Sequence, residues 1–260
     1  MQEKQIKIWT YNINYKEYWP EHDQAIVILH GWWWESDSWM QLGELLSNNN
    51  FKVIIPDLPW FWKTEIKSVF TLDDYALLIE NFIKELKIDE LILWWHSNWW
   101  AISIKIANRW KLDITRLVLN NSAWIRNDNK RSVKRKIFNS ITKLIKKGIP
   151  KEWGGRILKS LRNLFYRFIW SQDYLKAERN PYLKQTYLNM ISSDLTKDIA
   201  QIQINTLLLW GEKDTYTPLS DWLFMRKLIP HSKIVTIPDE KHGIHLQNPK
   251  LLISTFLKNI

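Results

Sequence analysis

The sequence predicts an α/β fold with a doubly wound, mostly parallel sheet and an inserted helical segment. Three observations lead to this prediction: short apolar runs recur along the chain, helical patterns separate them, and the alternation stops in a basic region near residues 126–195. Strands covered on both faces read as continuous apolar runs. Repeated strand and helix units join through right-handed crossovers into one sheet.

Two kinds of strand are expected. Apolar and polar residues alternate at 6–8 and again at 11–15, which favours an antiparallel hairpin at a sheet edge. Buried parallel strands are expected where apolar residues follow one another without interruption. These runs are Ala25–Leu29, Lys52–Ile55, Leu91–Leu93, Leu117–Leu119, Asn205–Leu209 and Lys233–Ile237.

Helices are expected between these runs. Residues 72–86 have apolar side chains at helical spacing after Thr71, with Asp73 and Asp74 in the first turn, where the helix dipole favours acidic groups. Further helices are expected at 101–107, 218–227 and 247–258.

The insertion divides the chain into two predicted parts. Residues 1–125 and 196–260 form the core, and residues 126–195 read as basic amphipathic helices. Residues 126–184 hold 17 of the 37 Lys and Arg but only 4 of the 27 Asp and Glu, so this segment carries +13 and the remainder −3 of the net +10. A solvated helical face is the main interpretation, and attraction to anionic substrates or lipid surfaces is the alternative.

Composition excludes several classes of site. The chain has no cysteine, so disulfides, thiolate metal sites and a cysteine nucleophile are ruled out. The first residues lack the apolar core of a signal peptide, and no apolar run approaches the ~20 residues that cross a bilayer. We therefore expect a cytoplasmic location. No phosphate-binding loop or zinc-ligand spacing is present, so no cofactor or metal is expected.

Tryptophan is unusually abundant, with 18 residues against 7 glycines, whereas globular proteins contain more glycine than tryptophan. The tryptophans cluster after apolar runs, at 32–34, at 60 and 62, and within 94–100, where tight turns are expected. Turns in which backbones pass closely require glycine. We infer that many of these positions are UGA codons, which the source organism reads as glycine and which were translated here as tryptophan.

Other observations bear on this interpretation. Abundant Lys, Ile and Asn are typical of an AT-rich gene. Trp39 and Trp210 fit helical and strand patterns and are interpreted as genuine, while Trp32 fits either reading. A tryptophan-rich surface for stacking or sugar binding is disfavoured, because the tryptophans do not follow the period of a helix or strand face.

Three residues in loops after predicted strands suggest nucleophilic catalysis. Ser97 follows the run at 91–93, Asp214 follows the run at 205–209, and His242 follows the last predicted strand. A serine needs a base within hydrogen-bond reach and a third group that orients the base. His245 is an alternative base, but His242 comes first after the strand. His30 and His96 are interpreted as structural or pocket-lining.

The three residues occur along the chain in the order Ser, Asp, His. In this order, in His30-Gly31 and in the small-x-Ser-x-small turn expected around Ser97, the chain resembles the α/β-hydrolase family with a helical cap. The resemblance covers nearly the whole length. It implies that Ser97 is the nucleophile, His242 the base and Asp214 the orienting acid. It also implies an oxyanion hole made by the backbone N–H groups of Trp32 and Asn98. The tryptophans around the elbow depart from the family pattern.

The resemblance implies hydrolysis of a carboxylic ester of small to medium size, with the cap at 126–195 as the pocket roof and a small molecule as partner. A carbon–carbon bond hydrolase of the same fold is one alternative. A second is a non-catalytic, degenerate hydrolase whose basic cap docks on an acidic partner or a membrane surface. Nucleic-acid binding is not expected, since aromatic residues do not interleave the basic ones in a recognised motif.

Overall fold

The computed structural model describes residues 1–19, 21–32, 34–61, 63–65, 68–97, 100–122, 176–178, 180–193, 195–217 and 219–260. The chain divides into two compact units, one made of residues 1–125 and 192–260 and the other of residues 126–191. In the second unit, the description covers α7 (Pro181–Ser192) up to the unit boundary and a few residues before it. The helices expected at 126–175 lie outside the described residues.

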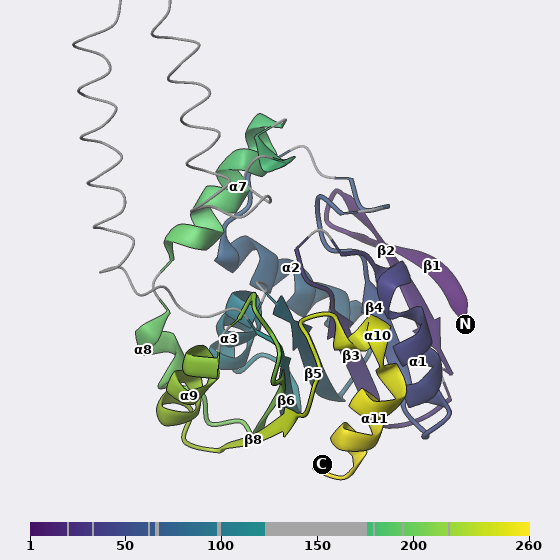
Figure 1. Ribbon diagram of the computed structural model, residues 1–260. Coiled ribbons are helices and arrows are strands. Elements are labelled where there is room, and N and C mark those ends of the chain that lie inside the picture. Colours follow the sequence, from purple (N-terminus) through teal and green to yellow (C-terminus); the bar gives the residue numbers. More distant parts are fainter. Residues whose placement is uncertain are drawn as a thin grey trace, which may run out of the picture. The chain divides into compact units, whose positions relative to one another are not determined.

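Among the described residues, eight strands form one sheet in the order β1-β2-β4-β3-β5-β6-β7-β8 (Figure 1). β1 pairs antiparallel with β2, β2 pairs antiparallel with β4, and the other neighbours are parallel. The predicted mostly parallel sheet with an antiparallel edge hairpin is therefore confirmed. The strands are β1 (Gln2–Ile8), β2 (Tyr11–Tyr18), β3 (Ala25–Leu29), β4 (Lys52–Pro56), β5 (Glu90–His96), β6 (Asp113–Asn120), β7 (Thr206–Gly211) and β8 (Ser232–Ile237).

The order of the strands reverses at β3. From β3 the chain passes to β4 on one side, and β5 then returns to pair with β3 on the other side. The loops that leave the carboxyl ends of β3 and β5 diverge at such a reversal and leave a crevice between them, where α/β sheets bind ligands. This geometry places Gly31 and Ser97 at the same edge of the sheet.

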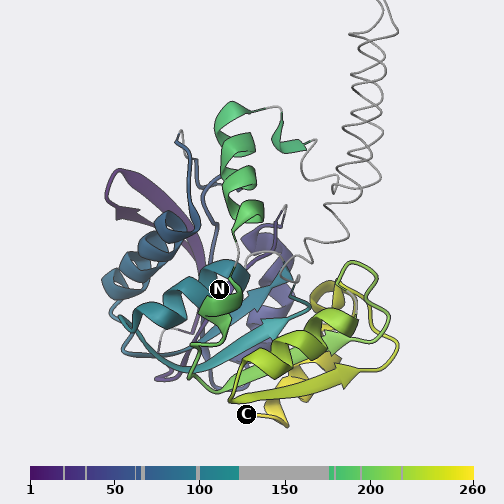
Figure 2. The ribbon, with the colours of Figure 1, turned by 90° about the vertical axis from the view of Figure 1, so that its left-hand side faces the viewer.

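Helices cover both faces of the sheet (Figures 1 and 2). α1 and α11 pack on each other on one face, whereas α2 and α3 pack together on the other, and α9 contacts β7 and β8. The longer helices are α1 (Met40–Ser47), α2 (Leu72–Glu85), α3 (Trp100–Arg109), α9 (Leu219–Leu228) and α11 (Pro249–Leu257), and the short ones are η1 (Ser36–Trp39), α8 (Thr196–Ile199) and α10 (Ile244–Gln247).

The core between the sheet and α1 and α11 uses alternate residues of β3, β4, β5 and β7. Ile26 and Ile28 of β3 are fully buried there and join Leu42 of α1 and Phe256 of α11 in one apolar cluster. Burying one such side chain contributes about 1.5–3 kcal/mol. The continuous apolar run at Ala25–Leu29 is explained by burial on both sides, because its other residues face the opposite layer of helices.

The start of α2 follows the local sequence. Thr71 is the N-cap, and its hydroxyl accepts a hydrogen bond from Asp74 N at 3.2 Å. The Asp74 carboxylate accepts a hydrogen bond from Thr71 N at 2.8 Å, which completes a capping box. Such a cap stabilises a helix by about 1 kcal/mol. The predicted start of this helix is confirmed.

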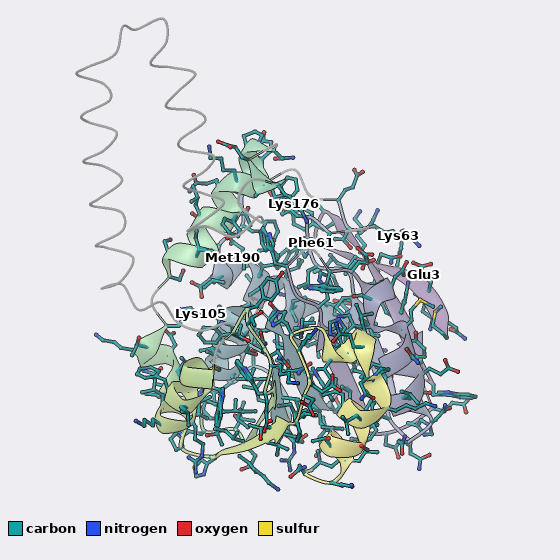
Figure 3. The ribbon with its side chains drawn as sticks, in the orientation of Figure 1. Glu3, Phe61, Lys63, Lys105, Lys176 and Met190 are labelled. Carbon is teal, nitrogen blue, oxygen red and sulfur yellow. The ribbon has the colours of Figure 1, made fainter. Side chains whose placement is uncertain are left out.

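Ion pairs tie separate segments together, and Glu3, Lys63 and Lys105, which take part in them, are labelled in Figure 3. Lys63 lies 2.5 Å from Glu3 of β1, and its hydrogen bond, with one from Asn14, lowers the pKa of Glu3 to about 2. Lys105 of α3 bonds the Asp198 carboxylate of α8 at 3.1 Å. Pairs this exposed contribute little stability each, about 0–1 kcal/mol.

The predicted turn at Trp94 and Trp95 is wrong in one respect. β5 extends through His96, so both indoles lie inside the strand and are fully buried. Pairing with β3 and β6 on its two sides keeps β5 extended up to Ser97, and the turn begins only there.

Within the described ranges, four tryptophans have left-handed backbone conformations. The φ angles are 53° at Trp9, 44° at Trp19, 77° at Trp60 and 52° at Trp110. Trp9 lies in the turn between β1 and β2, and Trp110 directly follows the last residue of α3. Both are positions at which glycine is strongly preferred, because a Cβ atom is strained at positive φ. Trp9, Trp19 and Trp110 are also exposed, so packing does not compensate for the strain.

Trp110→Gly is expected to raise the free energy of unfolding above that of Trp110→Ala by about 1 kcal/mol, because alanine keeps the Cβ that opposes a left-handed conformation. Both variants remove the same exposed indole, so they form a matched pair. Chemical denaturation would measure the difference. Equal stability of the two variants would show that Trp110 is unstrained.

Candidate active site

Ser97 occupies a sharp turn between β5 and α3. Its φ angle is 61°, a region that serine rarely adopts, and its side chain is almost fully buried. A strained strand-to-helix turn of this kind presents the serine hydroxyl at the top of the sheet. Asn98, the next residue and an expected oxyanion donor, lies outside the described residues.

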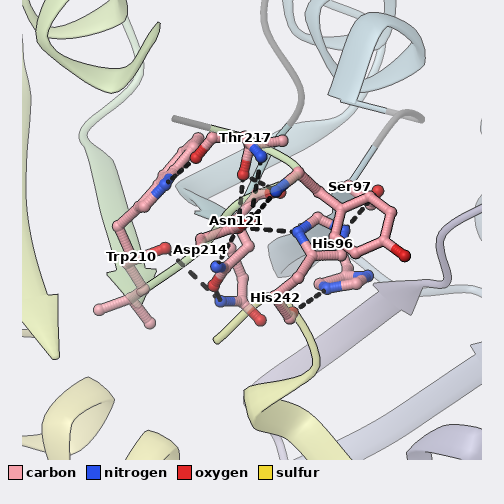
Figure 4. Close-up of polar contacts among 10 residues, drawn as sticks. His96, Ser97, Asn121, Trp210, Asp214, Thr217 and His242 are labelled. Carbon is pink, nitrogen blue, oxygen red and sulfur yellow. Dashed lines mark hydrogen bonds and ion pairs between the residues drawn. The ribbon is translucent and has the colours of Figure 1, made fainter. Parts of the chain in front are cut away.

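The structure brings Ser97, His242 and Asp214 together from the loops after β5, β8 and β7 (Figure 4). His242 Nε2 lies 2.9 Å from Ser97 Oγ, and His242 Nδ1 lies 2.7 Å from Asp214 Oδ2. The three residues singled out in the sequence are thus linked in one chain of hydrogen bonds, although 145 positions separate Ser97 from His242.

The partners of His242 define its tautomer. The Asp214 carboxylate only accepts hydrogen bonds, so Nδ1 is the N–H that donates to it. In the neutral ring, Nε2 then carries a lone pair that faces the Ser97 hydroxyl. This arrangement allows the imidazole to take the serine proton.

The Asp214 carboxylate is enclosed by donors. Its Oδ1 accepts hydrogen bonds from Tyr216 N at 2.8 Å and Thr217 N at 2.9 Å, and its Oδ2 accepts from Asn121 Nδ2 at 2.6 Å and Thr217 Oγ1 at 2.5 Å. Burial alone would raise the pKa of Asp214, but the hydrogen bond and charge of His242, with the bonds from Asn121 and Thr217, outweigh it and lower that pKa. Asp214 is therefore ionised at neutral pH.

Sequence reasoning did not identify Asn121 and Thr217. Thr217 could have been found, because a hydroxyl three residues after an aspartate is a common turn contact. For Asn121, the sequence contains only one indication of a functional role, namely its position directly after an apolar strand.

The loop after β3 approaches the Ser97 turn closely. A Cβ atom on Gly31 would lie 3.0 Å from His96 Nδ1 and 3.1 Å from Ser97 Cβ, so only glycine fits without a shift. Trp34 N donates to Gly31 O at 3.1 Å and closes a tight turn around Trp32. The Trp32 residue named as an oxyanion donor is consequently part of the loop that borders Ser97.

Two buried histidines lie beneath the site. His96 Nε2 is 3.0 Å from the His242 carbonyl oxygen and so anchors that loop. The His245 ring stacks on Trp39, with centroids 4.1 Å apart and planes 6° apart. Burial lowers the pKa of His245 to about 3 and holds the pKa of His96 well below its ordinary value. Of the two candidate bases, His242 is the one beside Ser97.

His30 has a structural position. Its Nε2 accepts a hydrogen bond from Leu58 N at 2.9 Å, and its Nδ1 lies 2.9 Å from Gly31 O. The ring thus ties the loop after β3 to the loop after β4, as the structural interpretation of His30 expected.

The described ranges hold neither a candidate metal centre nor a membrane-spanning helix. No group of three or more His, Asp or Glu side chains there could hold a metal ion. Likewise, no helix in those ranges is both long and apolar enough to span a bilayer.

Sequence comparison agrees with this geometry. A family model described as "Alpha/beta hydrolase family" matches residues 26–255, which is most of the chain. The chain belongs to the alpha/beta hydrolase family. The match runs from β3 through α11 and so includes Ser97, Asp214 and His242.

The following proteins are distantly similar to this chain. The uncharacterized hydrolase YugF of Bacillus subtilis is 23% identical, over 95% of this chain and 94% of its own length. The structure of a thermophilic esterase from Thermogutta terrifontis matches with a TM-score of 0.71 at 19% identity, covering 99% of this chain and 97% of the esterase. A bromoperoxidase from Bacillus anthracis gives a TM-score of 0.71 at 16% identity, covering 99% of each chain. At these identities the likeness shows the fold alone.

The buried histidines of this alpha/beta hydrolase should make it sensitive to acid. The folded-state pKa of His245 lies below the ordinary value of 6.5, so the unfolded chain binds a proton that the folded chain excludes. Stability is therefore fully present above pH 6.5 and falls as the pH drops toward 3, by up to about 1.4 kcal/mol per pH unit for each such histidine.

His245→Phe retains an aromatic ring beside Trp39. Between pH 6.5 and 5, unfolding of this variant should take up about one proton fewer than unfolding of the parent chain, so its unfolding free energy should depend less steeply on pH. Denaturant unfolding at several pH values would measure this slope. His231→Gln serves as the control, since His231 is exposed. An unchanged slope in His245→Phe would show that His245 takes up a proton in the folded state.

Proposed function

We propose that this protein is a serine hydrolase that cleaves a carboxylic ester of small to medium size through an acyl-enzyme on Ser97. The observation that carries the proposal is the pair of hydrogen bonds at His242, one 2.9 Å from Ser97 Oγ and the other 2.7 Å from Asp214 Oδ2. A nucleophile, a base and an orienting acid in this arrangement define the serine-hydrolase triad.

The mechanism follows from the direction of these bonds. His242 Nε2 takes the Ser97 proton as Oγ attacks the ester carbonyl, and Asp214 stabilises the imidazolium that forms. The protonated ring then gives its proton to the departing alcohol oxygen as the carbon–oxygen bond breaks. Water, deprotonated by the same ring, attacks the acyl-enzyme and releases the acid while Ser97 regains its proton. Backbone N–H groups of Trp32 and Asn98 are assigned to the oxyanion, each typically worth about 3 kcal/mol.

An exposed aromatic residue beside the base supports a substrate with an apolar acyl group or leaving group. The Tyr216 side chain is 81% exposed, and its ring centroid lies 5.1 Å from that of His242. An exposed aromatic ring beside the base offers an apolar contact for a small ester. The Thermogutta esterase of the same fold is consistent with this substrate class.

We also infer that many tryptophans stand where the gene specifies glycine. The left-handed conformations of Trp9, Trp19, Trp60 and Trp110 support this inference.

Trp210 differs from these tryptophans. Its Nε1 donates to Thr217 O at 2.9 Å, and its ring is buried. A satisfied indole in a regular strand is consistent with a genuine tryptophan, as interpreted from the sequence.

In a chain with glycine restored at the suspect turns, Ser97→Ala should reduce the hydrolysis of short-chain p-nitrophenyl esters by more than about a thousandfold, because the nucleophile is lost while the fold remains. Ser254→Ala, a serine on α11 remote from the site, is the matched control and should keep full activity. Turnover that survives Ser97→Ala would contradict the proposed nucleophile.

Fluorophosphonate labelling, mapped by peptide mass spectrometry, would test the glycine inference. We expect label on Ser97 of a glycine-restored chain and not on the chain as printed, because bulky indoles crowd the elbow. Label on both chains would show that the tryptophans are genuine. Label on neither, with both folded and bound to anionic vesicles, would favour the non-catalytic alternative. The restored chain carries Trp33→Gly, Trp34→Gly, Trp60→Gly, Trp62→Gly, Trp94→Gly, Trp95→Gly, Trp99→Gly and Trp100→Gly.

A further inference from the structure

Asn121 lies directly after β6 and is fully buried at the carboxyl edge of the sheet. Its φ angle is 45°, and asparagine is among the few residues other than glycine that tolerate this left-handed conformation. Its backbone N–H donates to Leu209 O of β7 at 2.9 Å, so the strained residue is held against the neighbouring strand. A buried, strained polar residue at a site edge suggests a role beyond packing.

The side chain of Asn121 has a single consistent orientation. Its Oδ1 accepts a hydrogen bond from Asn120 Nδ2 at 2.8 Å, which leaves its Nδ2 to donate to Asp214 Oδ2 at 2.6 Å. The reverse orientation would place an amide oxygen against a carboxylate oxygen. Asn120 therefore fixes which end of the Asn121 amide faces Asp214.

The oxygen that Asn121 contacts is also the one that faces the base. Asp214 Oδ2 lies 2.6 Å from Asn121 Nδ2 and 2.7 Å from His242 Nδ1. A donor on this oxygen restrains the rotation of the carboxylate and withdraws part of the negative charge that His242 experiences. Figure 4 shows Asn121 and His242 converging on Asp214.

Building on the proposed serine-hydrolase function, we propose that Asn121 is a positioning residue that sets the orientation and effective charge of Asp214, and through it the basicity of His242. It acts from β6, a strand that contributes none of the proposed triad residues. Thr217 supports the same carboxylate from the loop of Asp214 itself, whereas Asn121 ties the acid to the end of β6.

Several titratable groups face His242 and must stay in place during any test. They are Asp214 and Tyr216 from the loop after β7, His96 at the end of β5, and His245 from α10. A substitution at Asn121 replaces none of these four residues.

The test compares Asn121→Gly with Asn121→Asp in the glycine-restored chain. Asn121→Gly keeps the left-handed backbone but removes the amide, so kcat should fall about tenfold with little change in KM. The acid limb of kcat/KM should move to higher pH, because the unshielded carboxylate stabilises the imidazolium more strongly. Asn121→Asp, which adds a second carboxylate at this point, should move it further in the same direction.

Asn50→Gly is the matched control, since Asn50 also has a positive φ angle, 66°, and is exposed. It should leave kcat and the acid limb unchanged. NMR titration of the His242 ring in isotopically labelled protein gives a readout that needs no turnover, and its midpoint should rise in the order wild type, Asn121→Gly, Asn121→Asp.

A reduced kcat with an unmoved acid limb and an unmoved His242 titration would show that Asn121 is merely structural and would overturn the proposal. Failure of the proposed function has a different signature, namely the absence of Ser97-dependent turnover in the chain that retains Asn121. In that case the NMR titration still decides whether Asn121 tunes His242.

Discussion

The candidate site depends on the close approach of two backbone turns at the carboxyl edge of the sheet. A Cβ atom on Gly31 would lie only 3.1 Å from Ser97 Cβ and would force a shift, and Ser97 itself adopts a left-handed conformation. Both turns arise because the strand order reverses at β3, so that loops from adjacent parallel strands diverge on either side of one crevice. Small residues and strained torsion angles are therefore required by the topology before any chemistry is considered.

A series of hydrogen bonds links Ser97 to His242, His242 to Asp214, and Asp214 to Asn121. Asp214 and Asn121 are buried, so their hydrogen bonds are stronger than in water and a missing partner would destabilise the site. The neighbouring His96 and His245 are kept neutral by burial, so they add no positive charge that would compete with His242 for Asp214. The apolar layer beneath the site thus contributes to its electrostatics.

Much of this arrangement could be predicted from sequence because two-sided burial leaves a clear pattern. The run Ala25–Leu29 coincides with β3, whereas the end of β5 was misplaced because tryptophans at 94 and 95 read as turn positions although the neighbouring strands keep them extended. Ser97, Asp214 and His242 could be found because each follows an apolar run. Asn121 could not, since an asparagine after a strand is ordinary, and its contact with Asp214 spans 93 residues.

The tryptophans with left-handed backbone conformations have a consequence for expression of the gene. A torsion angle belongs to the fold, whereas the side chain attached to it depends on how the ribosome decodes a triplet. Trp9 occupies the turn of the first hairpin, ahead of every parallel strand. If UGA encodes that position, a production host that treats UGA as a stop signal would release only the peptide of residues 1–8, so the gene must be recoded before any full-length protein is obtained.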